Sequence, residues 1–214
     1  MLAGATGLVG GQLLQLLLND PGVSCIHALS RKPLSISHPK LQVHIVDFTS
    51  LPLLPDADEA YLALGTTIKV AGSKEAFRAV DYGANLAVAR AAILAGVSRM
   101  GLVSAGMANA KSSMFYTRVK GELENALRTL PLTTLVIAQP SLLLDYRSGL
   151  GQPLRLGEII SIPLARLFSP VLPGTYKPVR AQAVARALMQ TVPVSEGVVV
   201  LPSDQLIKLG AGSE

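Results

Sequence analysis

Apolar residues along the chain fall into short compact runs and longer runs with helical spacing, and the two kinds alternate. A compact run predicts a strand, and apolar residues that recur every three or four positions predict a helix. Glycine, proline and capping residues separate the runs. The predicted strands cover residues 1–3, 23–29, 41–46, 59–64, 100–103, 133–138 and 197–201. The predicted helices cover 8–19, 73–95, 112–129, 157–167 and 179–190, with Ser73 and either Ser112 or Ser113 as N-caps.

Strands that alternate with helices predict an α/β fold: a Rossmann-type, doubly wound and mostly parallel sheet. We expect one domain over residues 1–214, with 141–190 forming a small C-terminal lobe on the substrate side. The first strand is short for the centre of a sheet, so we expect the natural chain to start before Met1. Ligands of such sheets bind beyond the carboxyl ends of the strands, where candidate site residues are therefore sought.

A glycine-rich segment follows the first predicted strand and leads into the first predicted helix. Its glycines are spaced so that one permits a tight turn, one lets phosphates approach, and one lets helix pack on strand. Backbone N–H groups at the start of the helix can then hold a pyrophosphate. The expected cofactor-binding residues of this segment are Gly4, Ala5, Thr6, Gly7, Leu8, Val9 and Gly10.

The end of the second predicted strand carries basic residues where an NAD-binding fold places an acidic one. A carboxylate there accepts hydrogen bonds from the ribose 2′-OH, whereas Arg31 would bind a 2′-phosphate by charge-assisted hydrogen bonds. We therefore expect NADP(H) to be preferred over NAD(H), with solvated loop charges as the alternative reading. The other expected cofactor contacts are Ser30, Lys32, Asp47, Phe48, Leu64, Gly65, Thr66 and Pro140.

Three residues form a candidate catalytic set. Tyr116 and Lys120 are four residues apart and so share one face of a predicted helix. Ser104 follows the fifth predicted strand at the carboxyl edge of the sheet. A nearby cation favours the phenolate, so Tyr116 could exchange a proton with a substrate hydroxyl or carbonyl while Ser104 hydrogen-bonds the same oxygen. Lys120 would also hold the nicotinamide ribose.

These motifs resemble the atypical short-chain dehydrogenase/reductases. The resemblance rests on the glycine segment, Ser104, Tyr116-x-x-x-Lys120 and the stretch 80–85, and within the family residues 115–124 are similar to the Tat-interacting-protein-like subgroup. It implies a nicotinamide dinucleotide, with Ser104, Tyr116 and Lys120 as the catalytic trio and Asn85 as a candidate helper. Ala105 stands where relatives often have a second serine, so that role is either empty or falls to Ser112 or Ser113.

Charge and composition narrow the partners. The net charge is +5, and an excess of basic residues gathers between positions 147 and 186, near the predicted lobe. With 4% aromatic residues and no Trp, the chain lacks the pattern of a nucleic-acid surface. The basic residues either attract an anionic substrate, with Arg147 as the best contact, or only solvate the surface. They are Arg147, Arg155, Arg166, Lys177, Arg180 and Arg186, with Glu158 among them.

Metal, membrane and export signals are not evident. The three histidines have no metal-ligand spacing, so no metal site is expected. Residues 1–19 are uncharged but lack a positive start and contain four glycines, so we expect neither a signal peptide nor a membrane helix. Cys25 is expected to be buried in a strand and unreactive. Because a single cysteine cannot form an internal disulfide, the expected compartment is a reducing cytoplasm.

The sequence thus predicts an NADP-dependent oxidoreductase of the short-chain type that acts on a small carbonyl or hydroxyl substrate. The alternative is a non-catalytic NAD(P)H-binding regulatory or scaffold protein. The substrate cannot be identified, because the residues after Pro140 contain no interpretable motif.

Overall fold

A computed structural model describes residues 1–144 and 177–211, and its core is a seven-stranded sheet in which every neighbouring pair is parallel. The strand order is β3-β2-β1-β4-β5-β6-β7, which is the doubly wound order expected of a Rossmann-type fold. The predicted fold class is therefore confirmed. The strands are β1 (Leu2–Ala3), β2 (Ile26–Ser30), β3 (Leu41–Ile45), β4 (Glu59–Leu62), β5 (Arg99–Val103), β6 (Thr134–Gln139) and β7 (Gly197–Pro202).

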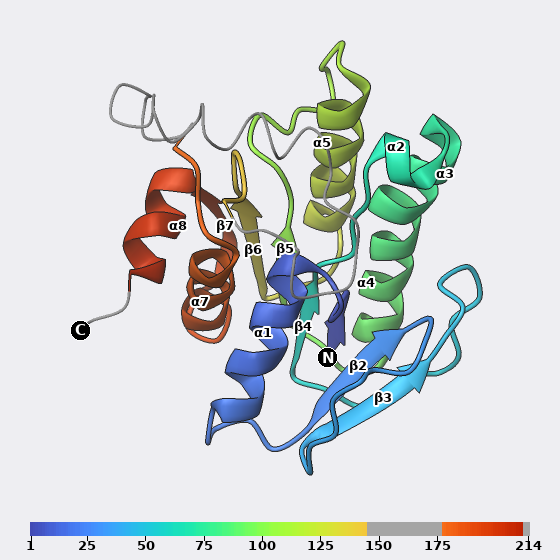
Figure 1. Cartoon of the computed structure of the whole chain (residues 1–214), viewed down its shortest axis with the longest axis vertical. Coiled ribbons are helices and arrows are strands. Elements are labelled where there is room, and N and C mark those ends of the chain that lie inside the picture. Colours follow the sequence, from blue (N-terminus) through green and yellow to red (C-terminus); the bar gives the residue numbers. More distant parts are fainter. Residues whose placement is uncertain (145–176, 212–214) are drawn as a thin grey trace.

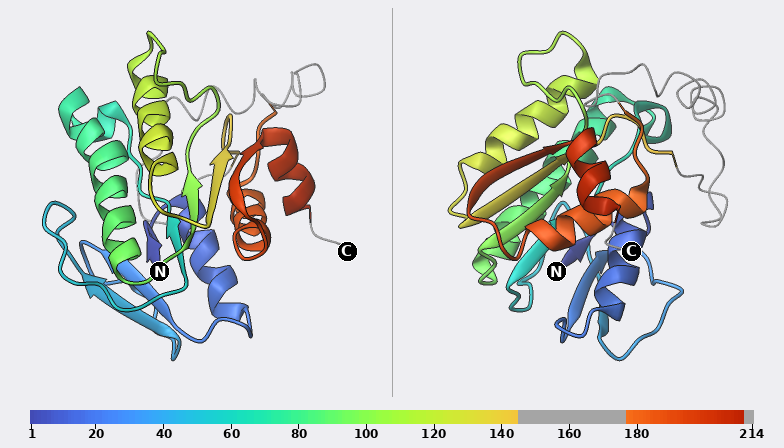
Figure 2. Two further views of the ribbon diagram at one scale, coloured as in Figure 1. Left: turned by 180° about the vertical axis from the view of Figure 1, so that it is seen from behind. Right: turned by 90° about the vertical axis from the view of Figure 1, so that its left-hand side faces the viewer.

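Helices cover both faces of the sheet, as Figures 1 and 2 show. One face packs against α1 (Leu8–Asn19), α7 (Ala181–Thr191) and α8 (Ser203–Gly210). The other packs against α4 (Asn85–Leu94) and α5 (Phe115–Arg128). The remaining helical segments among the described residues are α2 (Ile68–Ala71), α3 (Lys74–Arg78) and η1 (Ala79–Ala84), the last a π-helical stretch.

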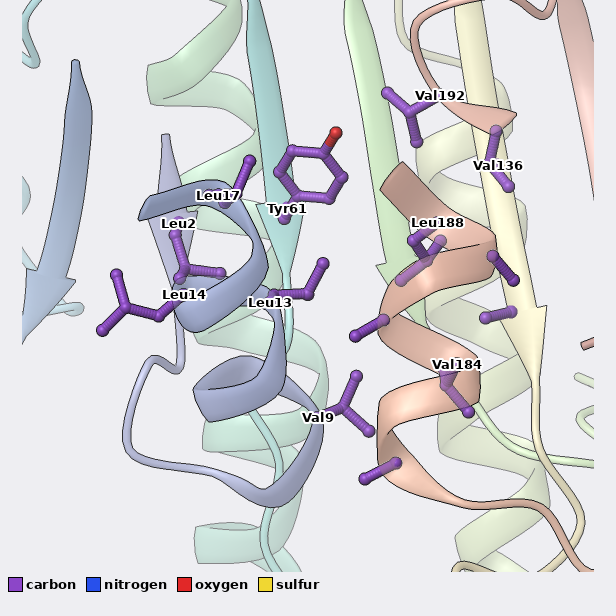
Figure 3. Close-up of a cluster of buried hydrophobic side chains, with 14 of the residues drawn as sticks. Leu2, Val9, Leu13, Leu14, Leu17, Tyr61, Val136, Val184, Leu188 and Val192 are labelled. Atoms are coloured by element: carbon purple, nitrogen blue, oxygen red, sulfur yellow. The ribbon is translucent and has the colours of Figure 1, made fainter. Parts of the chain in front are cut away.

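The apolar core consists of two clusters, one on each face of the sheet. In the first cluster, the apolar side of α1 meets the apolar side of α7 above the sheet, with Tyr61 of β4 and Val136 of β6 beneath them (Figure 3). Leu13 and Leu188 are fully buried there. The three-to-four-residue spacing of leucines that predicted the first helix is thus explained by packing against α7.

The first strand occupies the centre of the sheet although it has only two residues. Leu2 and Ala3 pair with β2 on one side and with β4 on the other, and both side chains are fully buried. The expectation that the natural chain starts earlier stays a prediction.

Several predicted elements differ in the structure. The predicted helix over 73–95 begins where expected, since the Ser73 hydroxyl accepts a hydrogen bond from the Ala76 N–H, but it is divided into α3, η1 and α4. Neither Ser112 nor Ser113 caps α5, because Met114 is its N-cap and the Ser112 hydroxyl instead accepts hydrogen bonds from Met114 and Thr117. Helices α2 and α8, which are only 4 and 8 residues long, were not predicted from the sequence. The helix predicted over 157–167 lies outside the described residues.

Cys25 is exposed and precedes β2, so the prediction of a buried strand cysteine is wrong. β2 begins only at Ile26, whose N–H donates to the carbonyl of Lys40. The chain ahead of it turns out to solvent after α1, where Gly22 and Ser24 are also exposed.

Candidate functional site

The glycine turn between β1 and α1 leaves no room for a side chain at two positions. Gly4 has φ +96°, and a Cβ on it would lie 2.4 Å from the carbonyl oxygen of Ala63, which follows β4. A Cβ on Gly10 would lie 2.0 Å from the carbonyl oxygen of Gly4, so the helix could not pack as closely on the turn. Gly4 therefore permits the tight turn and Gly10 lets the helix pack closely, as the sequence predicted. Their role toward a cofactor stays a prediction.

The start of α1 suits a phosphate group. Gly7 is the N-cap and its N–H donates to the carbonyl of Gly4 at 2.9 Å, which closes the turn. Within the described residues, no side chain caps this helix and no acidic residue stands in its first turn. The free N–H groups and the helix dipole there attract an anion. The turn therefore fits the pyrophosphate of a dinucleotide, which the backbone of residues 5–9 would hold.

The end of β2 presents two exposed cations, Arg31 and Lys32. The Ser30 hydroxyl accepts a hydrogen bond from the Lys32 N–H, which turns the chain away from the strand. In the parts of the chain that the structure describes, neither cation forms an ion pair with a carboxylate. Both remain available to an anionic ligand.

Asp47 and Phe48 follow β3, the strand beside β2. The Asp47 carboxylate accepts hydrogen bonds from the backbone N–H and the hydroxyl of Thr49, and these bonds lower the pKa of that carboxyl. Asp47 thus stabilises its own turn, while Phe48 packs at the margin of the second core cluster.

Lys120 is held in a buried ion pair that the sequence analysis did not anticipate. Its Nζ lies 2.7 Å from Oδ1 of Asp81, and the two side chains are only 5% and 1% exposed. The other carboxylate oxygen of Asp81 accepts a hydrogen bond from the N–H of Thr66, in the loop that follows β4. A Cβ on Gly65 would lie 3.9 Å from the Lys120 ammonium, so the cation lies at the carboxyl edge of the sheet.

Tyr116 lies one helical turn before Lys120 and is 40% exposed. Its ring packs against Phe77 of α3, with 5.6 Å between ring centroids. Phe77 is fully buried and also contacts Phe115. The aromatic contacts of Phe77 thus support a tyrosine that remains open to a substrate.

Ser104 belongs to a buried polar network. It is 5% exposed, and its hydroxyl donates a short hydrogen bond to the carboxylate of Glu124 on α5. The side-chain amide of Gln139 donates to both oxygens of the same carboxylate, at 2.9 and 3.0 Å. The hydroxyl hydrogen of Ser104 is therefore committed to Glu124, and its free lone pairs are left to accept from another group.

Asn85 connects the fourth strand to the helix that follows it. Its side chain is fully buried, and its amide donates to the carbonyl oxygens of Leu64, Val80 and Asp81. Pro140, also buried, accepts a hydrogen bond from the Gly106 N–H through its carbonyl. These contacts fix the loops around the candidate site.

A sequence signal existed for both missed carboxylates. Glu124 lies four residues after Lys120 and eight after Tyr116, so it falls on the same face of α5, which also carries the buried Leu127. Asp81 follows the buried Phe77 by four residues. An acidic residue on a helix face that is otherwise buried needs a partner inside the protein.

The predicted basic segment is described only in part. Arg147, Arg155 and Arg166 lie outside the described residues, as does Glu158. Arg186 donates to the carbonyl of Gly210 at the end of α8, and Arg180 is the exposed N-cap of α7. The carbonyl of Lys177 accepts a hydrogen bond from Ser141. Attraction of an anionic substrate stays a prediction.

Residues 1–144 and 177–211 contain no group of three or more His, Cys, Asp or Glu placed to hold a metal ion. No helix in the same ranges combines the length and apolar character needed to cross a bilayer.

Solved structures with a similar fold include sugar-nucleotide 4-epimerases and an oxidoreductase. MoeE5 in complex with UDP-glucose and NAD superposes with a TM-score of 0.67 at 19% identity, over 98% of this chain and 80% of that one. An oxidoreductase of the short-chain dehydrogenase/reductase family from Burkholderia thailandensis gives a TM-score of 0.63 at 13% identity, over 99% and 96% of the two chains. The fold is thus that of the short-chain dehydrogenase/reductases.

Fungal proteins that share one name are among the sequence relatives, while no protein-family model matches the chain. "Protein FMP52-1, mitochondrial" of Scheffersomyces stipitis is 34% identical over 78% of this chain and 80% of its own length. "Protein fmp52, mitochondrial" of Aspergillus clavatus is 32% identical over 98% of this chain and 97% of its own length. These names contradict the expected cytoplasmic location, and the Tat-interacting-protein-like subgroup is not among them. With such identity over most of both chains, the chain belongs to the FMP52 protein family.

Proposed function

We propose that the protein binds a nicotinamide dinucleotide at the carboxyl edge of its sheet and is an oxidoreductase of the short-chain type. The observation that carries the proposal is the Lys120 ammonium, fixed beside Gly65 at the same edge of the sheet as the glycine turn. The dinucleotide, when bound, would donate or accept a hydride. The substrate class is a small molecule with a carbonyl or hydroxyl group.

The residues of the site have separate duties in this proposal. Tyr116, exposed at the start of α5, exchanges a proton with the substrate oxygen. Lys120 holds the nicotinamide ribose, and Asp81 keeps its ammonium in place. To contact the same substrate oxygen, Ser104 must donate to it, so its hydroxyl hydrogen has to leave Glu124 when the substrate binds.

The preference for NADP(H) over NAD(H) is part of the proposal. It is supported by exposed Arg31 and Lys32 at the end of β2, where no acidic residue stands to repel a 2′-phosphate. MoeE5, the structural neighbour, has NAD in its complex. The preference therefore rests on this chain's own residues.

A second candidate function is a regulatory protein that binds NAD(P)H without turnover. The observation in its favour is that Ser104 is buried and committed to Glu124, while Ala105 offers no hydroxyl beside it. Residues 115–124 resemble the Tat-interacting-protein-like subgroup, whose members include proteins described mainly as regulators, and this resemblance favours the same function.

We also propose a mitochondrial location, since the fungal relatives are named as mitochondrial proteins. Fractionation of cells that make the full natural protein with a C-terminal tag tests this. Recovery of the tagged protein outside mitochondria would overturn it.

The experiment compares the wild-type protein with Tyr116→Phe. NADPH binding is measured by fluorescence titration, and NADPH oxidation is followed with a panel of aldehydes, ketones and nucleotide sugars. The enzyme proposal expects oxidation by the wild type, loss of at least about 100-fold in Tyr116→Phe and nearly unchanged NADPH affinity. Tyr82→Phe is the matched control, since Tyr82 stacks with Arg78 and should retain activity. Binding without oxidation by any compound would favour the regulatory function, and no binding would refute both.

A further inference from the structure

A cavity of about 370 Å³ lies at the edge of the sheet opposite the candidate site. Its lining comes from segments that precede strands, namely residues 20–27 before and within β2 and 56–59 before β4. The amino ends of parallel strands share one edge, and the glycine turn lies at the other. Cys25 and His27 both line this cavity.

Cys25 is the first member of a chain of three side chains in contact. Its Sγ lies 3.6 Å from Nε2 of His27, and Nδ1 of His27 lies 3.0 Å from Nε2 of His44. Cys25 stands directly before β2, two residues from His27, which is the second residue of that strand. His27 is in register with Gln42, so His44 lies two residues further along β3 on the same face.

A nucleophile, a base in hydrogen-bond reach and a third group that orients the base form the arrangement that activates a nucleophile. We propose that Cys25 is a site of thiol–disulfide exchange with small cationic or neutral disulfides, with His27 as the base and His44 as the residue that orients it. The proposal is independent of the nucleotide site, because the cavity lies at the other edge of the sheet.

The role of base requires one tautomer of His27. In that tautomer the Nδ1–H of His27 donates to Nε2 of His44, and the lone pair of His27 Nε2 is left to accept the thiol proton. Burial, and then the nearby His44, lower the pKa of His27. His27 is therefore a neutral acceptor at neutral pH.

The exchange balances without a further reactant. The Cys25 thiolate attacks one sulfur of the disulfide RSSR, a new S–S bond forms to that sulfur, and the original S–S bond breaks. The leaving thiolate takes the proton held by His27 and departs as RSH. Cys25 is oxidised to a mixed disulfide, and half of the reagent is reduced.

The charges around the cavity select among disulfides. The carboxylates of Asp20, Asp56, Asp58 and Glu59 line it, and none of its lining residues is Lys or Arg. The Lys40 ammonium is bound to the carbonyl of Asp20. The cavity is therefore negative and disfavours an anionic reagent.

The experiment measures modification rates by intact mass, which is unambiguous because the chain has one cysteine. With the neutral reagent hydroxyethyl disulfide at pH 7, folded wild-type protein should react faster than the same protein unfolded in urea. His27→Asn should react at least about tenfold more slowly than the folded wild type, and His44→Asn should be slowed less. His38→Asn is the control, since His38 lies in another loop and only accepts from the Lys40 N–H.

A second arm uses reagents of different charge. Cystamine, a dication, should react faster than hydroxyethyl disulfide, and oxidised glutathione, an anion, should react most slowly. In the double variant Asp56→Asn, Asp58→Asn these differences should shrink, as they should at high salt. Equal rates for wild type and His27→Asn, or a folded protein no faster than the unfolded one, would overturn the proposal. Equal rates for the three reagents would overturn the charge selection.

Discussion

The ammonium group of Lys120 lies 2.7 Å from the carboxylate of Asp81, and both side chains are almost completely withdrawn from solvent. The two residues come from different helical segments, α5 and η1, so the pair ties these segments together. Asp81 is also bound to the N–H of Thr66 after β4. The Asp81 carboxylate therefore fixes the positions of α5, of the loop at Thr66 and of the Lys120 ammonium, which is proposed to hold the ribose.

Asp81→Asn should destabilise the protein strongly. The amide can still accept from Thr66, but Lys120 would keep a buried charge without a partner, which typically costs about 3–5 kcal/mol. Urea unfolding measures the loss. Glu122→Gln is the control, because its pair with Arg78 is partly exposed and should contribute at most about 1 kcal/mol. Equal losses in the two variants would contradict the assignment of Asp81.

Gly10→Ala and Gly11→Ala should have opposite effects, although the two positions are adjacent in α1. A Cβ at position 10 would clash with the carbonyl of Gly4, whereas at position 11 the nearest atom is 3.5 Å away. Gly10→Ala should lower the melting temperature and impair dinucleotide binding. Gly11→Ala should stabilise the protein by up to about 1 kcal/mol, since alanine is the better helix former. Thermal unfolding of both variants checks this.

The double substitution Arg31→Ala, Lys32→Ala should weaken NADPH binding by about 10- to 100-fold, the loss expected for charge-assisted hydrogen bonds. NADH has no 2′-phosphate, so its affinity should change little. Titration of cofactor fluorescence measures both. Arg90→Ala, which removes an exposed cation on α4, should leave both affinities unchanged. Parallel losses for NADPH and NADH in the double variant would refute the preference.

Tyr61 should make stability fall at alkaline pH. Burial, and then the charge of Glu59, raise the pKa of its phenol above the usual value of about 10. Above pH 10 the unfolded chain loses this proton while the folded protein keeps it, so folding becomes less favourable by about 1.4 kcal/mol per pH unit. The free energy of unfolding of the wild type minus that of Tyr61→Phe should be constant below pH 9 and should decrease above pH 10.

The fold could be predicted because its signals are local. The leucines of α1, the glycines around it and the alternating residues of β3 each indicate their own element, and alternation of elements then indicates the sheet. The division of the helix after Ser73 could not be predicted, because a π-helical stretch has no distinct apolar period. Cys25 was misplaced since it stands directly before apolar strand residues.

The candidate site could be predicted as a set of residues but not as a set of partners. Tyr116 and Lys120 share a helix, so their spacing shows that they are neighbours. Asp81 and Glu124 each bind a residue far away in the sequence, and which carboxylate meets which donor depends on how the helices pack. That packing cannot be deduced from a single sequence.

The π-helical stretch Ala79–Ala84 sets the rotational phase between α3 and α4. A regular helix turns by about 100° per residue and a π-helix by less, so winding the same six residues as a regular α-helix would rotate α3 by about 100° relative to α4. Asp81 could then face Lys120, or Phe77 could stay beneath Tyr116, but not both. The winding of this stretch is thus as constrained as the identity of its residues, and any change that converts it to a regular α-helix without removing a residue should separate one of these two pairs.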